Sequence, residues 1–117
     1  MQTITLEYNK NQELTFSEAL LPKPYTLESL FVIQVDGRSM EPLIQDKALV
    51  VADLSQKEFE EGSIYLVFQE QRMWIKKASI RDAKPCFISL NQGYEHLVYN
   101  LGDVRVIAKA LLTFTAF

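Results

Sequence analysis

Cysteine and histidine each occur only once in the 117 residues, as Cys86 and His96. A single cysteine excludes an internal disulfide, which is typical of proteins from a reducing compartment, and it excludes a zinc site made of cysteines alone. A single histidine excludes a metal centre with several histidine ligands. We therefore expect neither a metal nor a cofactor.

Long apolar runs and a surplus of basic residues are also lacking. No stretch approaches the roughly 20 apolar residues that span a bilayer, and the first residues, "MQTITLEYNK", do not have the pattern of a signal peptide. The net charge is -3 and the 12 basic residues are scattered, which argues against direct binding of nucleic acid. We expect a cytoplasmic protein that makes no contact with membranes.

Short runs rich in Val, Ile, Phe, Tyr and Thr recur along the chain, and polar, Gly or Pro residues separate them. Such runs are typical of β-strands, and an apolar content of 48% is enough for a hydrophobic core. Residues 16–25 predict one helical turn that Pro22 and Pro24 stop. A hairpin is expected around Glu70 and Gln71. The fold class predicted is mainly β, with one or two short helical turns. The expected strands are 3–8, 30–35, 48–53, 63–69, 72–79, 86–90, 96–100 and 104–114.

Ser39 lies in "VDGRSMEPLIQ" (35–45), between a glycine turn and a Met-Glu-Pro step. A serine hydroxyl needs a base to become a nucleophile, and the usual base is a histidine oriented by a carboxylate. Glu95, the neighbour of His96, would point to the opposite face of an extended segment. We therefore interpret His96 as a surface residue, and Cys86 as a small buried residue of a strand.

A neutral lysine is the other base that can activate a serine. It requires an amine whose pKa, about 10.4 in solution, is lowered by burial in apolar surroundings. In "QRMWIKKASI" the period of two places Lys76 on the face of Trp74 and Lys77 on the face of Ile75. Periodicity alone does not choose between the two lysines, and a solvated pair at a strand edge is the common alternative.

Taken together, these segments resemble the LexA/UmuD-like self-cleaving serine-lysine peptidases, which include the C-terminal domains of many phage repressors. "GRSMEP" is similar to the family's "GxSMxP", and "IKK" to its "VKR" triplet. "ISLNQGYEHLVYN" looks like its "SxNPxY" hairpin, and "VRVIAKAL" like its closing strand. The interval between serine and lysine is also of the family's usual size. The resemblance covers most of the chain, from about residue 30 to about residue 112.

The resemblance implies a role for each matching residue. Ser39 matches the nucleophile and Lys76 the base, while Lys77 takes the place of the arginine that points away. Backbone N–H groups of Arg38 and Ser39 would hold the oxyanion of the attacked peptide carbonyl. The supporting turn would comprise Gly37, Met40 and Pro42. Met40 and Ile44 are expected to pack beneath the loop as core residues.

The resemblance also implies an architecture and partners. It predicts a catalytic domain of twisted, largely antiparallel sheets over residues 26–117, preceded by an N-terminal arm over residues 1–25. It implies a homodimer formed through the C-terminal strand. It further implies a recombinase filament or a DNA-binding domain outside this chain as a partner, and a role in the stress response or in prophage regulation.

Three features depart from the family pattern. Lys47-Ala48 replaces the usual Gly-Asp before a strand, and because glycine there would permit a positive φ, we expect a different turn. Ala108 replaces a glycine of the closing strand. No glycine precedes Gly37, and the family's cleaved bond, Ala-Gly or Cys-Gly, would fall within "MQTIT". The chain would then be part of a longer repressor, act on a partner, or have lost self-cleavage.

Two functions are therefore expected. The first is a serine endopeptidase that cuts its own longer precursor or a partner. The alternative is a dimerisation or assembly module of a repressor or of a polymerase-accessory subunit, in which proteolysis is unused. A relative of signal peptidases, which share a Ser-Met-x-Pro step and a lysine, is disfavoured because no membrane anchor is seen.

Overall fold

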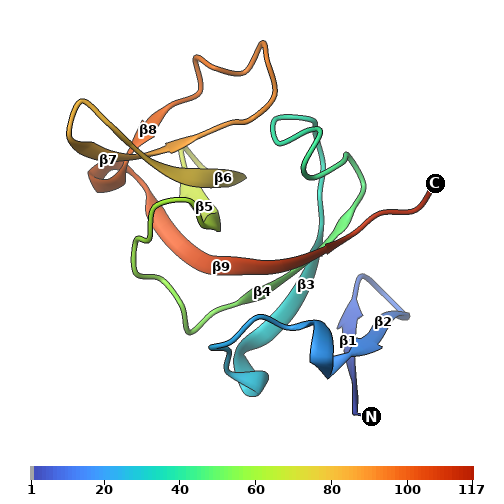
Figure 1. The fold of residues 1–117 in the computed structure, drawn as a ribbon. Helices are drawn as coiled ribbons and strands as arrows, with labels where there is room; N and C mark the ends of the chain where they lie inside the picture. Colours follow the sequence, from blue (N-terminus) through green and yellow to red (C-terminus); the bar gives the residue numbers. More distant parts are fainter. Residues whose placement is uncertain (1) are drawn as a thin grey trace.

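The structure is a computed structural model, and it describes residues 2–117. This part of the chain is built of strands joined by turns and by three short 3-10 helices (Figure 1). The prediction of a mainly β fold with short helical turns is confirmed. The strands are β1 (Thr3–Tyr8), β2 (Gln12–Ser17), β3 (Leu30–Gln34), β4 (Leu49–Asp53), β5 (Ile64–Gln69), β6 (Arg72–Arg81), β7 (Lys84–Ile88), β8 (Tyr99–Asn100) and β9 (Arg105–Phe114). The 3-10 helices are η1 (Glu18–Leu20), η2 (Leu27–Ser29) and η3 (Leu101–Asp103).

Seven strands of the described residues form one antiparallel sheet in the order β3-β4-β9-β5-β6-β7-β8. β9 joins its two halves: its first residues pair with β5, and its last residues pair with β4. The register shifts at both partners, and β9 curves strongly where it passes from one to the other (Figure 1). Such bulges bend a strand, so one long strand can serve two differently oriented parts of a sheet.

The predicted hairpin at Glu70 and Gln71 is confirmed, since β5 pairs with β6 directly across these two residues. Both residues have positive φ, 53° and 63°, as a two-residue turn between twisted strands requires. Asp82 and Ala83 make a turn of the same kind between β6 and β7. The two turns fold the lysine strand β6 back against both of its neighbours.

The N-terminal residues form a hairpin of β1 and β2, of which only β1 was predicted. Ile4 and Phe16 from this hairpin are buried together with Val32 of β3 and Val51 of β4. The alternation of apolar residues in "ELTFS" was a usable strand signal, but the expected helical turn at residues 16–25 obscured it. The hairpin therefore completes a core on one face of the β3–β4 pair.

Asp53, at the end of β4, is fully buried and fixes the segment that leads into β3. Its carboxylate accepts hydrogen bonds from the backbone N–H of Thr26 at 2.8 Å and from the side chain of Gln56 at 2.9 Å. The backbone N–H and the hydroxyl of Ser55 also donate to it. A buried carboxylate needs such donors, so this network holds the crossing from the N-terminal hairpin to the sheet.

Candidate active site

Ser39 lies in the loop that joins β3 to β4. Gly37 opens the loop with a φ of +122°, and its N–H donates to the carboxylate of Asp46 at 2.8 Å. Met40 and Ile44 are 2% and 3% exposed and anchor the loop on the core, as predicted. Their burial leaves Ser39 half-buried at the surface, where a substrate can reach it.

The segment after β7 holds the serine loop from the other side. The backbone N–H groups of Leu90 and Asn91 both donate to the carbonyl oxygen of Ser39 at 3.0 Å. The side-chain amide of Asn91 donates to the carbonyl oxygen of Arg38 at 2.7 Å. These bonds join segments that are far apart in the sequence and fix the main chain on both sides of the serine Cα.

Lys76 is fully buried, although it carries a potential charge. Its Nζ donates to the hydroxyl oxygen of Ser89 at 2.5 Å and to the carbonyl oxygen of Leu97 at 2.9 Å. The rings of Trp74 and Tyr99 lie over the amine, with centroids 4.9 Å and 5.1 Å from Nζ. The amine is thus enclosed by two aromatic rings and two neutral oxygen atoms.

No carboxylate compensates the charge of Lys76, since the ion pairs among residues 2–117 join Lys47 to Asp36 and Lys109 to Glu60. Burial therefore lowers the pKa of the Lys76 amine from 10.5 to about 8. At neutral pH roughly a tenth of the molecules then hold the free amine, against less than about one in a thousand for an ordinary lysine. Lys77, on the opposite face of the strand, is only half-buried.

A cleft of about 360 Å³ separates the serine loop from β6. One wall is formed by residues 33–40, which include Ser39, and the opposite wall by residues 72–75 of β6. Tyr94 and Leu97 also line the cleft. Leu97 therefore lines the cleft and also accepts a hydrogen bond from the amine of Lys76 through its carbonyl oxygen.

The β6 wall carries an open strand edge. β6 pairs with β5 over residues 72–77 but with β7 only over residues 77–81. Ala78 exchanges hydrogen bonds with the residues before β5, so by alternation Met73 and Ile75 turn their main-chain N–H and C=O groups toward the cleft. Unpaired main-chain groups of this kind are those to which an extended peptide can add as a strand.

The predicted oxyanion donors lie in the same cleft. Arg38 and Ser39 both line it, and their backbone N–H groups donate to no other residue within 2–117. These two donors are therefore available to an oxygen atom of a bound substrate. Pro42, in the same loop, is exposed, and its carbonyl oxygen accepts a hydrogen bond from the side chain of Gln45 at 2.9 Å.

The segment after β7 contacts both the loop of Ser39 and the amine of Lys76, and these two residues make no direct hydrogen bond with each other within residues 2–117. Leu90 binds the carbonyl oxygen of Ser39, and the preceding residue, Ser89, binds the amine of Lys76. The sequence interpretation missed Ser89, Asn91 and the Leu97 carbonyl. The "SxNPxY"-like segment was a signal for them, but nothing in the sequence placed that segment against the serine loop.

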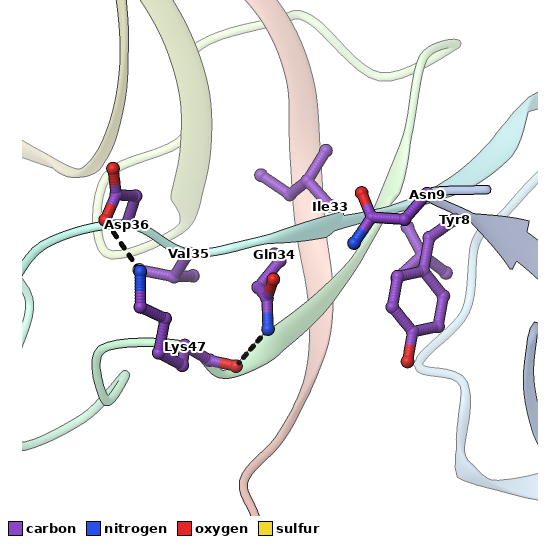
Figure 2. Close-up of a pocket in the computed structure, with 8 residues that line it drawn as sticks. Tyr8, Asn9, Ile33, Gln34, Val35, Asp36 and Lys47 are labelled. Carbon is purple, nitrogen blue, oxygen red and sulfur yellow. Dashed lines mark hydrogen bonds and ion pairs between the residues drawn. The ribbon is translucent and has the colours of Figure 1, made fainter. Parts of the chain in front are cut away.

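A second recess, of about 470 Å³, is lined by β3, by the N-terminal hairpin and by Lys47 in the turn before β4 (Figure 2). Tyr8 and Asn9 face it from the hairpin, while Lys47 closes it with bonds to Asp36 and to the side chain of Gln34. Ser39 lines the smaller cleft and not this recess, so the candidate active site is the smaller cleft; Lys76 is buried beside it, behind Trp74 and Leu97 that line it.

The other sequence candidates lie where they were expected. His96 is exposed, and Cys86 is a free cysteine buried in β7. Among residues 2–117 there is no group of three or more His, Cys, Asp or Glu side chains that could hold a metal ion. Within the same residues, no helix has the length and apolar character needed to cross a membrane.

The structure thus has a half-buried serine on a tight loop and a buried lysine on the β5–β6 hairpin, in a mainly β fold of largely antiparallel strands. The family model described as "Peptidase S24-like" matches residues 2–111. The chain belongs to this family, which is the LexA/UmuD-like family that the sequence motifs indicated. A search of curated proteins finds no match.

Proposed function

We propose that the chain is a serine endopeptidase domain in which Ser39 is the nucleophile and Lys76 the general base. The observation that carries the proposal is the fully buried amine of Lys76, whose pKa is lowered to about 8 and which has no carboxylate partner. An ammonium in such surroundings is costly, and a chain gains nothing in stability by placing one there. The geometry instead suits a base of which an appreciable fraction is neutral near physiological pH.

In the proposed reaction, the free amine of Lys76 takes the proton of the Ser39 hydroxyl while Oγ attacks the peptide carbonyl. The developing oxyanion accepts hydrogen bonds from the N–H groups of Arg38 and Ser39. Lys76 returns the proton to the leaving amine, and the peptide bond breaks to give an acyl-serine. Water then attacks the ester while Lys76 takes its proton, and Lys76 returns this proton to Oγ of Ser39 as the ester C–O bond breaks, which releases the acyl fragment as a carboxylic acid and restores both residues.

The substrate is proposed to be a peptide segment of a longer precursor of this chain or of a partner. It would add as a strand to the edge that Met73 and Ile75 leave open. Such addition fixes the scissile carbonyl by main-chain bonds, so the reaction requires few side-chain contacts. By family analogy, the biological setting would be repressor or stress-response regulation in the cytoplasm, with a recombinase filament as the trigger.

The test is digestion of a proteome-derived peptide mixture at several pH values, with cleavage sites identified by mass spectrometry. New termini should appear with the unchanged chain and disappear with Ser39→Ala and with Lys76→Ala. Ser63→Ala, which removes a hydroxyl bonded to Glu60 on the surface, is the matched control and should cleave normally. Cleavage that persists in Ser39→Ala or Lys76→Ala, with both variants folded, would refute the assignment.

A second candidate function is an assembly module, and one feature of β9 favours it. Residues 110–114 of β9 pair with β4 along one edge. Along the other edge they have no strand partner within residues 2–117, because the pairing of β9 with β5 ends at residue 109. A shallow apolar recess lined by Leu43, Ile64 and Leu112 lies beside this half of the strand. We propose that two copies associate through it, as the resemblance implies. Leu112→Glu should convert a dimer into a monomer in analytical ultracentrifugation, and an unchanged sedimentation coefficient would contradict this.

A further inference from the structure

Ser89 is a buried polar residue that the proposed mechanism does not yet use. It follows β7, is 7% exposed, and its hydroxyl lies 2.5 Å from the amine of Lys76. It does not line the cleft, whereas Ser39 does. A substrate carbonyl therefore reaches Ser39 and not Ser89, so Ser89 is unsuited to be a second nucleophile.

The hydrogen-bond inventory of a primary amine gives Ser89 a specific task. A neutral amine has two N–H bonds and one lone pair, whereas an ammonium has three N–H bonds and none. Within residues 2–117, Nζ of Lys76 has two oxygen partners, Ser89 and the carbonyl of Leu97. Two acceptors satisfy both N–H bonds of the neutral amine and leave its lone pair free.

Of the two acceptor oxygens, only that of Ser89 can be removed by a substitution. The Leu97 oxygen belongs to the main chain, and its segment also lines the cleft. The Ser89 oxygen belongs to a side chain, and the residue after it bonds to the carbonyl of Ser39. Ser89 thus sits on the short main-chain connection that sets the position of the base relative to the nucleophile.

We propose that Ser89 is a positioning residue that accepts a hydrogen bond from Lys76 and leaves the amine lone pair for the hydroxyl proton of Ser39. This inference rests on the proposed function of Ser39 and Lys76. Loss of the Ser89 hydroxyl frees one N–H bond, so the amine can rotate away from the nucleophile. Misplacement by about 1 Å can lower a reaction rate about 100-fold.

The groups that face Lys76 leave its titration easy to interpret. Tyr65 of β5 lies opposite it in the sheet, and Tyr99 of β8 lies over its amine. Burial raises the pKa of both tyrosines above 10, so both remain neutral while Lys76 titrates. Trp74, Ser89 and Leu97 carry no charge in this range. A shift in the Lys76 midpoint on mutation of Ser89 therefore reports the hydrogen bond itself.

The experiment compares Ser89→Ala, Ser89→Thr and the control Ser79→Ala, which removes a half-buried hydroxyl from the same strand as Lys76. One readout is the pH–rate profile on the peptide mixture, and the other is NMR titration of Lys76 in lysine-labelled protein. Ser89→Ala should cleave about 100-fold more slowly. It should also titrate at lower pH, because an acceptor of the ammonium is lost. Ser89→Thr should restore both properties, and Ser79→Ala should change neither.

The two readouts separate this inference from the proposed function. If the unchanged chain cleaves and Ser89→Ala keeps its rate and midpoint, Ser89 has no positioning role. A slower Ser89→Ala with an unchanged Lys76 midpoint and no recovery in Ser89→Thr shows a merely structural role and also overturns the inference. If the unchanged chain does not cleave, the proposed function fails. The titration then decides alone whether Ser89 controls the amine: a lowered midpoint in Ser89→Ala supports the contact, and an unchanged one refutes it.

Discussion

The main-chain N–H of Leu90 donates a hydrogen bond of 3.0 Å to the carbonyl oxygen of Ser39. This bond connects the loop after β3 to the segment after β7. The same segment supplies Ser89 to the amine of Lys76, so one short stretch contacts the loop of the nucleophile and the side chain of the base. The relative position of the two proposed catalytic groups therefore depends on the segment that starts at Ser89.

Asn91→Ala tests this dependence. The Asn91 amide holds the carbonyl oxygen of Arg38 at 2.7 Å, and its loss should let the serine loop shift. We expect cleavage of the peptide mixture to fall about 10- to 100-fold, the effect of a misplacement near 1 Å, with a loss of stability of about 1 kcal/mol. Asn100→Ala, an exposed asparagine whose amide bonds to Asp103, is the control. An unchanged rate in Asn91→Ala would show that the loop holds its shape without this bond.

The pH dependence of cleavage follows from the lysine. The pKa of the buried Lys76 amine is lowered to about 8, and only the unprotonated amine can accept the serine proton. The rate should therefore rise with pH through about 8 and become constant above it. Initial rates over a buffer series give this profile. A rate that is highest in acid would exclude a lysine base.

The same amine makes the stability of the fold depend on pH. The pKa of Lys76 is about 8 in the folded chain against 10.5 for an ordinary lysine, so the unfolded chain binds more protons between these values. Stability should rise with pH in this window, by about 3 kcal/mol between pH 7 and pH 10.5 relative to Lys76→Met. Urea unfolding of both proteins at the two pH values measures the difference. Lys77→Met, on the opposite face, is the control, and a parallel pH dependence of the native chain and Lys76→Met would contradict the burial argument.

The two lysines show what the sequence can and cannot predict. Strand periodicity correctly placed Lys76 and Lys77 on opposite faces of β6. It could not choose the buried one, because that depends on the segment from Ser89 to Tyr99, which folds over the face of Lys76. The strand 96–100 was likewise expected to be longer than β8, which spans only Tyr99–Asn100. Here tertiary contacts, rather than local propensity, fix the backbone.

Asp53, the buried last residue of β4, gives a prediction about stability. Burial raises the pKa of the Asp53 carboxyl, but hydrogen bonds from Gln56, Ser55 and Thr26 outweigh this and lower it below its ordinary value. Asp53→Asn replaces an acceptor oxygen by an amide group that faces these donors. It should lower the free energy of unfolding at pH 7 by about 2 to 3 kcal/mol, the cost of unsatisfied bonds to a charged group.

The pH dependence separates this electrostatic effect from simple packing loss. The contribution of a carboxyl with a lowered folded pKa is complete above its unfolded pKa, about 3.9, and is lost as the pH falls through the folded value. The difference between the native chain and Asp53→Asn should therefore shrink in acid. Urea unfolding at pH 7 and pH 3 measures it, with the exposed Asp82→Asn as control. A difference that stays constant with pH would mean that the charge of Asp53 does not contribute.

Lys47 lies in the turn before β4, where the sequence departs from the family pattern. A different turn was expected because lysine replaces glycine, but Lys47 takes a φ of +70°, the conformation that glycine permits. A left-handed conformation costs a residue with a Cβ about 1 to 2 kcal/mol. The ion pair from Lys47 to Asp36 compensates little, since both side chains are largely exposed. The turn therefore holds Lys47 in a conformation that lowers the stability of the fold.

Lys47→Gly should consequently raise the free energy of unfolding by about 1 kcal/mol, because relief of the backbone strain exceeds the greater chain entropy of glycine in the unfolded state. Lys47→Ala is the matched control: it removes the same ion pair but keeps the Cβ, so it should give no gain. Urea unfolding compares the three proteins. A gain in both variants would attribute the effect to the lost charge, and a loss in Lys47→Gly would show that the ion pair, rather than the backbone, dominates this turn.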